Sequence, residues 1–312
     1  MKIHRNLNTL PTFRKAVITI GSFDGVHQGH QKIISMMKTE AERIDGETVI
    51  ITFDPHPRKI VKGGTYPISL LTSIEEKADL IDELGIDHMV IVPFTGDFSK
   101  MTPEEYVETF LVHYFHPSSI IVGYDHRFGS NRSGDFHLLE KLGKVYQYGV
   151  IEIPEHVLHS ISISSTYIRT AIAEGRLEDA NEYLGYPYLI AGEVIHGDKR
   201  GRTIGFPTAN MGEISTDKLI PVNGVYAVKV KIQDRPSTYN GMMNIGTRPT
   251  VSGEERRIEV HILNLNEDLY GQHIKVHLYK KIREEVKFGD LMELRTQIQK
   301  DQSEITRFFE NN

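Results

Sequence analysis

The sequence predicts two domains of different fold class: an α/β domain with a parallel sheet over residues 1–185, and a small β-barrel with a terminal helix over residues 186–312. The first observation is a strand, a glycine-rich turn and a helix in succession over residues 16–44. The second is that short apolar strands then alternate with helices, as in β-α-β units. The third is a hydrophobic period of two residues after the boundary, which is typical of antiparallel strands with one buried face.

The stretch around the first glycines carries the strongest signal. It predicts a strand over Ala16–Ile20, a glycine-rich turn over Gly21–Gly29 and an amphipathic helix from about His30 to Ile44. Free backbone N–H groups and the positive end of the helix dipole make such a turn a cradle for anions. His27 lies three residues before His30, so we expect both imidazoles near the helix start, as part of a phosphate site. The alternative is two surface histidines in a loop.

The glycine spacing fits neither the dinucleotide fingerprint nor the P-loop, since no Gly-Lys-Ser/Thr follows. The His-Gln-Gly-His element at residues 27–30 instead resembles the signature of the nucleotidyltransferase superfamily. That resemblance implies a Rossmann-like parallel sheet and histidines that hold a triphosphate and stabilise charge at the α-phosphorus. It also implies a glycine that lets the nucleotide lie against the backbone.

Apolar segments at residues 48–53, 89–93 and 119–123 predict further parallel strands. Capping boxes at Ser73–Glu76 and Thr102–Glu105 predict two helix starts. Polar loops at 21–29, 54–58 and 123–134 follow successive strands, so they meet at the carboxyl edge of the sheet, where ligands bind in such folds.

Two groups in the first half allow a structural and a functional interpretation. Asp125 and Arg127 form either a salt bridge or a substrate contact. The hydroxyls of residues 164–166 open a helix and are either helix caps or phosphate ligands, and Arg169, one turn later, can grip a phosphate with its guanidinium fork.

Four motifs, at residues 21–30, 53–57, 123–129 and 163–169, resemble the adenylyltransferase half of the prokaryotic bifunctional riboflavin kinase/FAD synthetase family. The ATP-binding residues that this resemblance implies are Gly21, Phe23, Asp24, Gly25, His27, Gly29, His30, Ser164, Ser165, Thr166 and Arg169. Of these, it implies catalytic roles for His27, His30 and Arg169. The flavin contacts that it implies are Phe53, Pro55, Pro57 and Asp125. The sequence departs from the family at His126, where the family usually has an aromatic residue.

Alternating segments at residues 189–195, 224–232, 257–263 and 274–279, with a helix from Asp290 to Phe309, predict a small closed barrel capped by that helix. The segment from residue 197 to residue 210 is rich in glycine and cations, which suits a flap over phosphates; a solvated basic hairpin is the alternative. No helix is expected in it. Thr208 and Asn210, if extended, share a face and can hold one Mg²⁺.

Motifs at residues 201–210, 223–226, 244–250, 258–263 and 282–288 resemble the flavokinase domain of the same family. The ATP-binding residues that the resemblance implies are Gly197, Lys199, Gly201, Thr203, Gly205, Pro207, Thr208 and Asn210. It implies that Thr208 and Asn210 hold MgATP and that Glu259 is the catalytic base. The flavin-binding residues that it implies are Arg283, Glu285 and Phe288.

We therefore expect an enzyme that phosphorylates riboflavin to FMN with ATP and then adenylates FMN to FAD, with Mg²⁺ as cofactor. The net charge of −6 argues against a nucleic-acid partner, and the absence of cysteine excludes disulfides and thiolate catalysis. No signal peptide or membrane span is evident, so we expect a cytoplasmic protein, preferably a monomer.

Two other functions remain open at this point. One is an aminoacyl-tRNA synthetase, which needs a Lys-Met-Ser-Lys-Ser element; residues 99–102 match that element only poorly. A flavin-binding sensor that has lost its chemistry is the other alternative.

Overall fold

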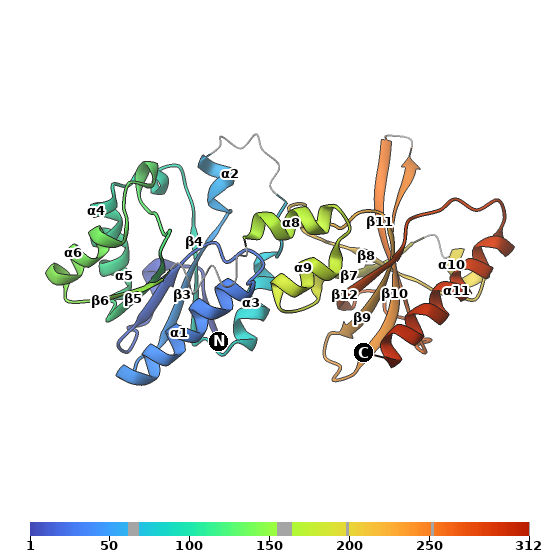
Figure 1. Cartoon of the computed structure of the whole chain (residues 1–312), viewed down its shortest axis with the longest axis horizontal. Coiled ribbons are helices and arrows are strands. Elements are labelled where there is room, and N and C mark those ends of the chain that lie inside the picture. Colours follow the sequence, from blue (N-terminus) through green and yellow to red (C-terminus); the bar gives the residue numbers. More distant parts are fainter. Residues whose placement is uncertain (62–68, 155–163, 198–199, 251–252, 312) are drawn as a thin grey trace. The chain divides into compact units, whose positions relative to one another are not determined.

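The computed structural model describes residues 1–61, 69–154, 164–197, 200–250 and 253–311. The chain divides into two compact units, Met1–Ser165 and Thr166–Asn312, and each has its own sheet (Figure 1). The expected succession of an α/β unit and a closed barrel is confirmed. The domain boundary near residue 185 stays a prediction.

The first unit is built on a six-stranded sheet whose neighbouring strands are all parallel, in the order β1-β4-β3-β2-β5-β6. The strands are β1 (Lys2–His4), β2 (Val17–Ile20), β3 (Thr48–Asp54), β4 (His88–Pro93), β5 (Ser119–Gly123) and β6 (Gly149–Ile153). The four central strands correspond to the predicted ones. The two edge strands, β1 and β6, were not predicted.

Helical segments connect these strands. They are η1 (Leu7–Thr9), α1 (Gln28–Ile44), α2 (Pro57–Val61), α3 (Ile74–Glu83), η2 (Phe98–Lys100), α4 (Pro103–Glu105), η3 (Tyr106–Val112, a π-helix), α5 (His113–Phe115), η4 (Ser130–Arg132) and α6 (Phe136–Tyr146). Both predicted capping boxes are present, at Ser73 with Glu76 and at Thr102 with Glu105. The predicted loop at 54–58 is shorter than expected, because Pro57 already begins α2.

Helices bury both faces of the central strands (Figure 1). On one face, Val17 and Ile50 pack with residues of α1 and α3; on the other, Ile18 and Ile51 pack with η3, α5 and α6. Successive strand residues point to opposite faces, so a strand buried on both sides is mostly apolar. This is why the apolar runs in the sequence locate the central strands.

The second unit contains a closed barrel with the strand order β10-β11-β8-β7-β12-β9. Its elements, with α8 starting at the end of the first unit, are α8 (Ser165–Ala173), α9 (Leu177–Leu184), β7 (Tyr188–Ile195), α10 (Arg200–Thr203), β8 (Ala209–Gly212), β9 (Gly224–Ile232), β10 (Thr238–Thr250), β11 (Gly253–Ile262), β12 (His273–Arg283) and α11 (Leu291–Glu310). The prediction that the segment after β7 has no helix is wrong, since α10 forms one short turn there.

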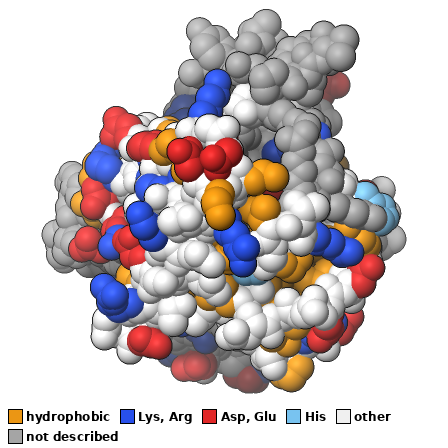
Figure 2. Space-filling model, turned by 90° about the vertical axis from the view of Figure 1, so that its right-hand side faces the viewer, with side chains coloured by type: hydrophobic (Ala, Val, Ile, Leu, Met, Phe, Trp, Pro, Cys, Tyr) orange, Lys and Arg blue, Asp and Glu red, His pale blue; other side chains and the backbone are white. Residues whose placement is uncertain are grey.

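On the face shown in Figure 2, described basic and acidic side chains are interspersed.

The terminal helix α11 is fixed to the barrel by an ion pair. Asp290 caps its start through hydrogen bonds from the Met292 and Glu293 N–H groups. Further along, the buried Asp301 carboxylate accepts hydrogen bonds of 3.0 and 2.9 Å from Nε of Arg283.

None of the helices in the described part of the chain has the length and apolar run that crossing a membrane requires.

A histidine pair at the edge of the first sheet predicts a pH-dependent stability. Nε2 of His4 lies 3.0 Å from Nδ1 of the buried His88. Burial, and then the charges of His88 and Lys2, lower the pKa of His4 below its ordinary value of 6.5. The unfolded chain then binds more protons, so this contribution to stability is complete above pH 6.5 and is lost as the pH falls through that value.

The urea-unfolding midpoint of the full chain, followed by circular dichroism, should therefore drop below pH 6.5. His4→Gln should weaken this pH dependence, and His137→Gln, which changes an exposed histidine on α6, should not. An equal pH dependence in wild type and His4→Gln would contradict the interpretation.

Candidate active sites

The turn between β2 and α1 has an unusual backbone. Phe23 and Val26 have φ values of 46° and 36°, a region that side chains with a Cβ rarely adopt, and Gly25 lies between them at 82°. Such conformations persist where the surroundings enforce them, and they are concentrated at functional sites. The helix begins at Gln28 rather than at His30, so Gly29 belongs to its first turn. The predicted turn over Gly21–Gly29 is therefore two residues too long.

The structure brings the two predicted histidines together. Their ring centroids are 3.8 Å apart and the rings are nearly parallel, at 18°. A Cβ on Gly29 would lie 3.2 Å from two atoms of the His27 ring, so a residue without a side chain makes room for the stack. Burial lowers the pKa of His30 well below its ordinary value, and the charges of His27 and Lys77 lower it further. His30 is therefore a neutral hydrogen-bonding group at pH 7.

Polar contacts fix the rest of the turn. The buried Asp24 accepts hydrogen bonds from the Leu71 and Thr72 N–H groups, at 2.8 and 3.2 Å. The Ser165 hydroxyl donates to the Asp24 carbonyl at 3.0 Å. Of the predicted ATP ligands, the structure thus gathers those of the turn and Ser165. Ser164 and Thr166 are exposed beside Ser165, and Arg169 is half-buried in α8 within the second unit.

The predicted flavin contacts lie in different surroundings. Phe53 is buried in an aromatic group, 5.3 Å from Phe94 and 5.7 Å from Phe98 between ring centroids. Pro55 and Asp125 are exposed after β3 and β5, and Pro57 is half-buried at the start of α2. All four residues follow or end strands at the carboxyl edge.

The loop after β5 resolves one of the alternatives. Arg127 pairs with Asp135 at 3.1 Å, so the salt bridge between Asp125 and Arg127 is wrong. His126 stacks on Phe128 at 5.9 Å between centroids, and burial lowers its pKa to about 4. At neutral pH this histidine is therefore an uncharged ring, as an aromatic residue in its place would be.

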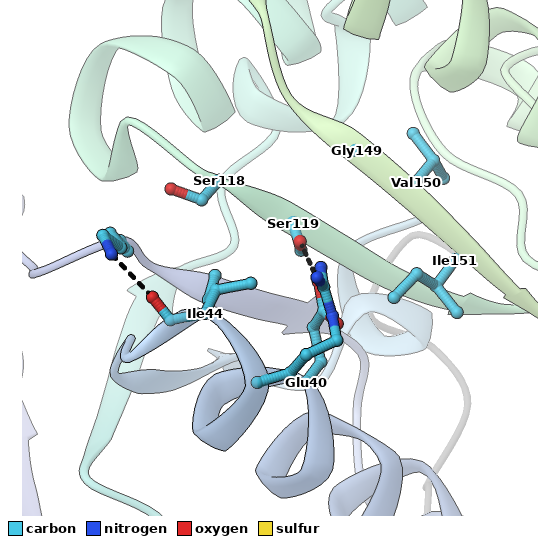
Figure 3. A pocket seen from close by; sticks show the side chains of 9 residues that line it. Glu40, Ile44, Ser118, Ser119, Gly149, Val150 and Ile151 are labelled. Carbon is cyan, nitrogen blue, oxygen red and sulfur yellow. Dashed lines mark hydrogen bonds and ion pairs between the residues drawn. The ribbon is translucent and has the colours of Figure 1, made fainter.

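A cavity of about 700 Å³ lies at the opposite, amino edge of the sheet (Figure 3). It is lined by Lys15, Glu40, Arg43, Ile44 and Ser119, among others. Glu40 accepts a 2.7 Å hydrogen bond from Ser119 and is bound by Arg43, while Lys15 donates to the Ile44 carbonyl. These groups satisfy one another, and none of them is near the histidine pair. We therefore assign no role to this cavity in the chemistry.

The barrel gathers the predicted kinase residues from separate strands. Asn210 on β8 and Glu259 on β11 are paired residues, so their side chains share a face of the sheet. The Thr208 hydroxyl donates a 3.3 Å hydrogen bond to Oε2 of Glu259. On the other side of β11, Asn244 of β10 also pairs with Glu259. One carboxylate thus stands between two amides and beside a hydroxyl.

A cavity of about 820 Å³ opens next to this group. Its lining includes Arg202, Pro207, Thr208, His261 and Tyr270. The Pro207 carbonyl lies 2.7 Å from Nδ1 of His261, which fixes the segment that carries Thr208. The cavity is large enough for a nucleotide base and its sugar, with Thr208 at its wall.

The predicted flap residues surround α10. A Cβ on Gly197 would overlap the Asn210 side chain at 2.2 Å, so the absence of a side chain allows that close approach. Gly201 and Thr203 lie in α10, and Gly205 follows it. Lys199 lies outside the described residues.

The predicted kinase flavin residues have structural contacts. The Arg283 guanidinium binds Asp301 and stacks over the Phe288 ring at 5.7 Å. Glu285 accepts a 3.0 Å hydrogen bond from the Asn223 amide. Both arrangements hold the chain that joins β12 to α11, on which Glu285 and Phe288 lie.

Three residues at these sites were not predicted: Lys77, Asn244 and His261. Asn244 lies in the motif at residues 244–250 and His261 in the motif at residues 258–263, but their contacts depend on strand register. Lys77 follows a capping box, and nothing local distinguishes it from a helical surface lysine.

The first unit thus has a candidate site for a nucleotide phosphate on a parallel sheet. The second unit brings a hydroxyl, an amide and a carboxylate together in a barrel. Together they define the class of the protein as a transferase with two active sites. The family pattern described as FAD synthetase matches residues 10–167, and that described as riboflavin kinase matches residues 184–309. The chain belongs to the bifunctional riboflavin kinase/FMN adenylyltransferase family.

Relatives under that description are similar over nearly the whole chain. The protein of Escherichia coli K12 is 39% identical, over 99% of this chain and 98% of the relative. The protein of Bacillus subtilis 168 is also 39% identical, over 95% and 93%. A solved structure described as a macrolide-efflux protein from Streptococcus pneumoniae has a TM-score of 0.82 and 30% identity, over 98% of both chains.

The ion pair of Arg283 allows a test of its structural role. Arg283→Met leaves the buried Asp301 carboxylate without its cation, so the free energy of unfolding of the second unit should fall by about 3 kcal/mol. Arg295→Met, which changes an exposed residue of α11, is the control. Urea unfolding of the full chain measures both, and equal midpoints for the two variants would contradict the structural role.

Proposed function

We propose that this chain makes both flavin nucleotides: the second unit phosphorylates riboflavin to FMN with ATP, and the first unit adenylates FMN with a second ATP, forming FAD and pyrophosphate. The observation that carries the proposal is that each of the two regions matched by a family pattern has its own cluster of polar side chains suited to phosphate chemistry. The stacked histidines lie in the first region, and Thr208, Asn210 and Glu259 lie in the second.

In the kinase reaction, Glu259 takes the proton of the terminal ribityl hydroxyl while that oxygen attacks the γ-phosphorus of ATP. A new oxygen–phosphorus bond forms, and ADP leaves with the electrons of the bond that breaks. The hydrogen bond from Thr208 orients the carboxylate before the reaction. Most of the acceleration comes from positioning and charge neutralisation.

Mg²⁺ fits the oxygen groups of the barrel. Hydroxyl, amide and carboxylate oxygens are ligands that this ion accepts, and it keeps waters and substrate phosphates as its other ligands. Within the described residues, no group of three or more His, Cys, Asp and Glu is placed to hold a metal ion. Thr208 and Asn210 would hold the ion together with ATP, and the bound ion would neutralise phosphate charge.

The adenylyl transfer needs no general base, because the FMN phosphate is already an anion. Its oxygen attacks the α-phosphorus of ATP, and pyrophosphate leaves. The N–H groups of His27 and His30 and the start of α1 stabilise the charge that develops on the phosphoryl oxygens. We assign Arg169 and the hydroxyls of residues 164–166 to the same triphosphate.

We extend the proposal to the remaining residues and to the setting of the enzyme. The flavin of the first unit would lie along Phe53, Pro55, Pro57 and Asp125, and the riboflavin of the second along Arg283, Glu285 and Phe288. The protein would act as a monomer in the cytoplasm, where ATP is available, without a nucleic-acid partner. A net charge of −6 supports the last point.

Incubation of the purified full chain with riboflavin and MgATP, followed by chromatography of the flavins, tests the proposal. FMN that is later converted to FAD supports it, and riboflavin that stays unchanged supports the flavin-binding sensor.

Variants of the two sites should lose opposite activities. Glu259→Gln keeps the shape of the side chain but removes the base, so FMN formation should fall by about 100-fold or more. FAD formation from added FMN should stay unchanged. His27→Ala and His30→Ala should lower FAD formation by about 100-fold and spare FMN formation. Loss of both activities in one folded variant would contradict the separate sites.

Metal dependence should be strong and reversible, because few protein oxygens hold the ion. After desalting, the chain should form no FMN from riboflavin and ATP until Mg²⁺ is added. Asn210→Ala should raise the Mg²⁺ concentration for half-maximal FMN formation by about tenfold, because one ligand is lost. FAD formation by the same variant is the internal control, and an unchanged Mg²⁺ requirement for FMN formation would remove Asn210 from the metal site.

A further inference from the structure

Lys77 is a buried cation near the histidine pair to which the proposed function gives no role. It lies in the first turns of α3, where its N–H donates to the Ser73 carbonyl at 3.0 Å. The residue is only 5% exposed, whereas lysines are almost never buried unless an anion or a hydrogen-bonding group pairs with them. A buried ammonium therefore needs an explanation.

The contacts within the protein do not satisfy this ammonium. Nζ has one hydrogen bond, of 3.4 Å, to Oγ1 of the buried Thr52. Asp24 and Asp54 attract the charge, but neither forms an ion pair with it. Two of the three donors of the ammonium thus find no acceptor among the described residues. Charge-assisted hydrogen bonds are strong, and leaving them unmade in a buried place is costly.

The position of Lys77 links it to the anion cradle. Thr52, which contacts Nζ, donates its own hydroxyl proton to the Ser22 carbonyl in the glycine-rich turn, at 3.3 Å. The adjacent Asp24 of that turn is held by the N–H groups that precede α3. Moreover, the charge of Lys77 is close enough to lower the pKa of His30.

Topology explains this convergence. β3 ends at the carboxyl edge of the parallel sheet, and α3, which comes after α2 and leads to β4, begins at that edge. α1 begins there too, after β2. The starts of two helices, two imidazoles and one ammonium thus lie at the same edge of the sheet. The carboxylates of Asp24 and Asp54 attract the ammonium without pairing with it, so a negatively charged ligand is a partner that this arrangement can still accept.

We propose that the Lys77 ammonium is a further substrate-binding group of the adenylyltransferase site and takes a phosphoryl oxygen of ATP or of FMN. This inference rests on the proposed function. The buried ammonium, poorly bonded in the free protein, gains its missing acceptors when the phosphate arrives, and the flexible lysine stem lets Nζ move toward it. The positive charge of Lys77 also offsets the negative charges of Asp24 and Asp54, which would otherwise repel a phosphate.

The protonation state of Lys77 supplies a specific signature. Burial lowers its pKa to about 8, against the opposing effect of Asp24 and Asp54. If the charged form binds phosphate, kcat/KM for FAD formation should fall as the pH rises through about 8. Lys77→Arg keeps the charge at all accessible pH values, so this alkaline decline should be absent.

The experiment uses the full chain and compares Lys77→Met, Lys77→Arg and the control Lys32→Met, which removes an exposed lysine of α1 near His30. We expect Lys77→Met to lower kcat/KM for FAD formation by about tenfold to 100-fold, and the control to change it by less than about twofold. FMN formation from riboflavin by the same samples shows that the chain is folded. Titration with inorganic pyrophosphate then measures binding of the leaving group.

Two outcomes support the inference and identify the phosphate. A raised KM for ATP with weaker pyrophosphate binding assigns Lys77 to the triphosphate, whereas a raised KM for FMN alone assigns it to the flavin phosphate. FAD formation by Lys77→Met at the wild-type rate, or an alkaline decline in Lys77→Arg equal to that of wild type, would overturn it. A wild-type chain that makes no FAD would refute the proposed adenylyl transfer itself.

Discussion

Two imidazole rings stacked 3.8 Å apart cannot both carry a positive charge unless an anion lies beside them. This constraint organises the first unit. Phe23 and Val26 have unfavourable positive φ values, and Gly29 has no side chain that would clash with the His27 ring. The helix α1 begins directly after His27. The sheet and its two helical layers place this turn at the carboxyl edge. In the free protein burial keeps the His30 ring neutral, and a phosphate bound there, as we propose, would place a negative charge beside the rings.

In the barrel, the groups that are brought together are side chains with oxygen atoms rather than imidazoles. Thr208, Asn210 and Glu259 come from different parts of the chain, and the register of β8 against β11 sets which of them meet. A closed ring of strands leaves little freedom for that register to slip. The first unit thus positions its groups through one turn and one helix start, whereas the second positions them through strand pairing.

This difference explains what the sequence could and could not predict. Strands buried on both faces, such as β3, are mostly apolar and were predicted, whereas the short, half-exposed edge strands β1 and β6 have no such signal. β8, which has only one buried residue, was not predicted as a strand for the same reason. His27 caps the start of α1 and His30 lies in its first turn, so local spacing predicted that the two rings meet. Asn244 and Lys77 reach their sites only through tertiary packing, which local sequence does not specify.

β8 also has a consequence for how the barrel responds to its substrates. It has four residues and joins β11 through only two residue pairs, so it is the shortest link in the ring. The same strand carries Asn210. A ligand that contacts both Asn210 and its paired residue Glu259 therefore spans the junction of β8 with β11, so its binding and the resistance of that junction to local opening are coupled. The kinase half should be at its most compact when it is occupied, and most open to proteases when it is empty.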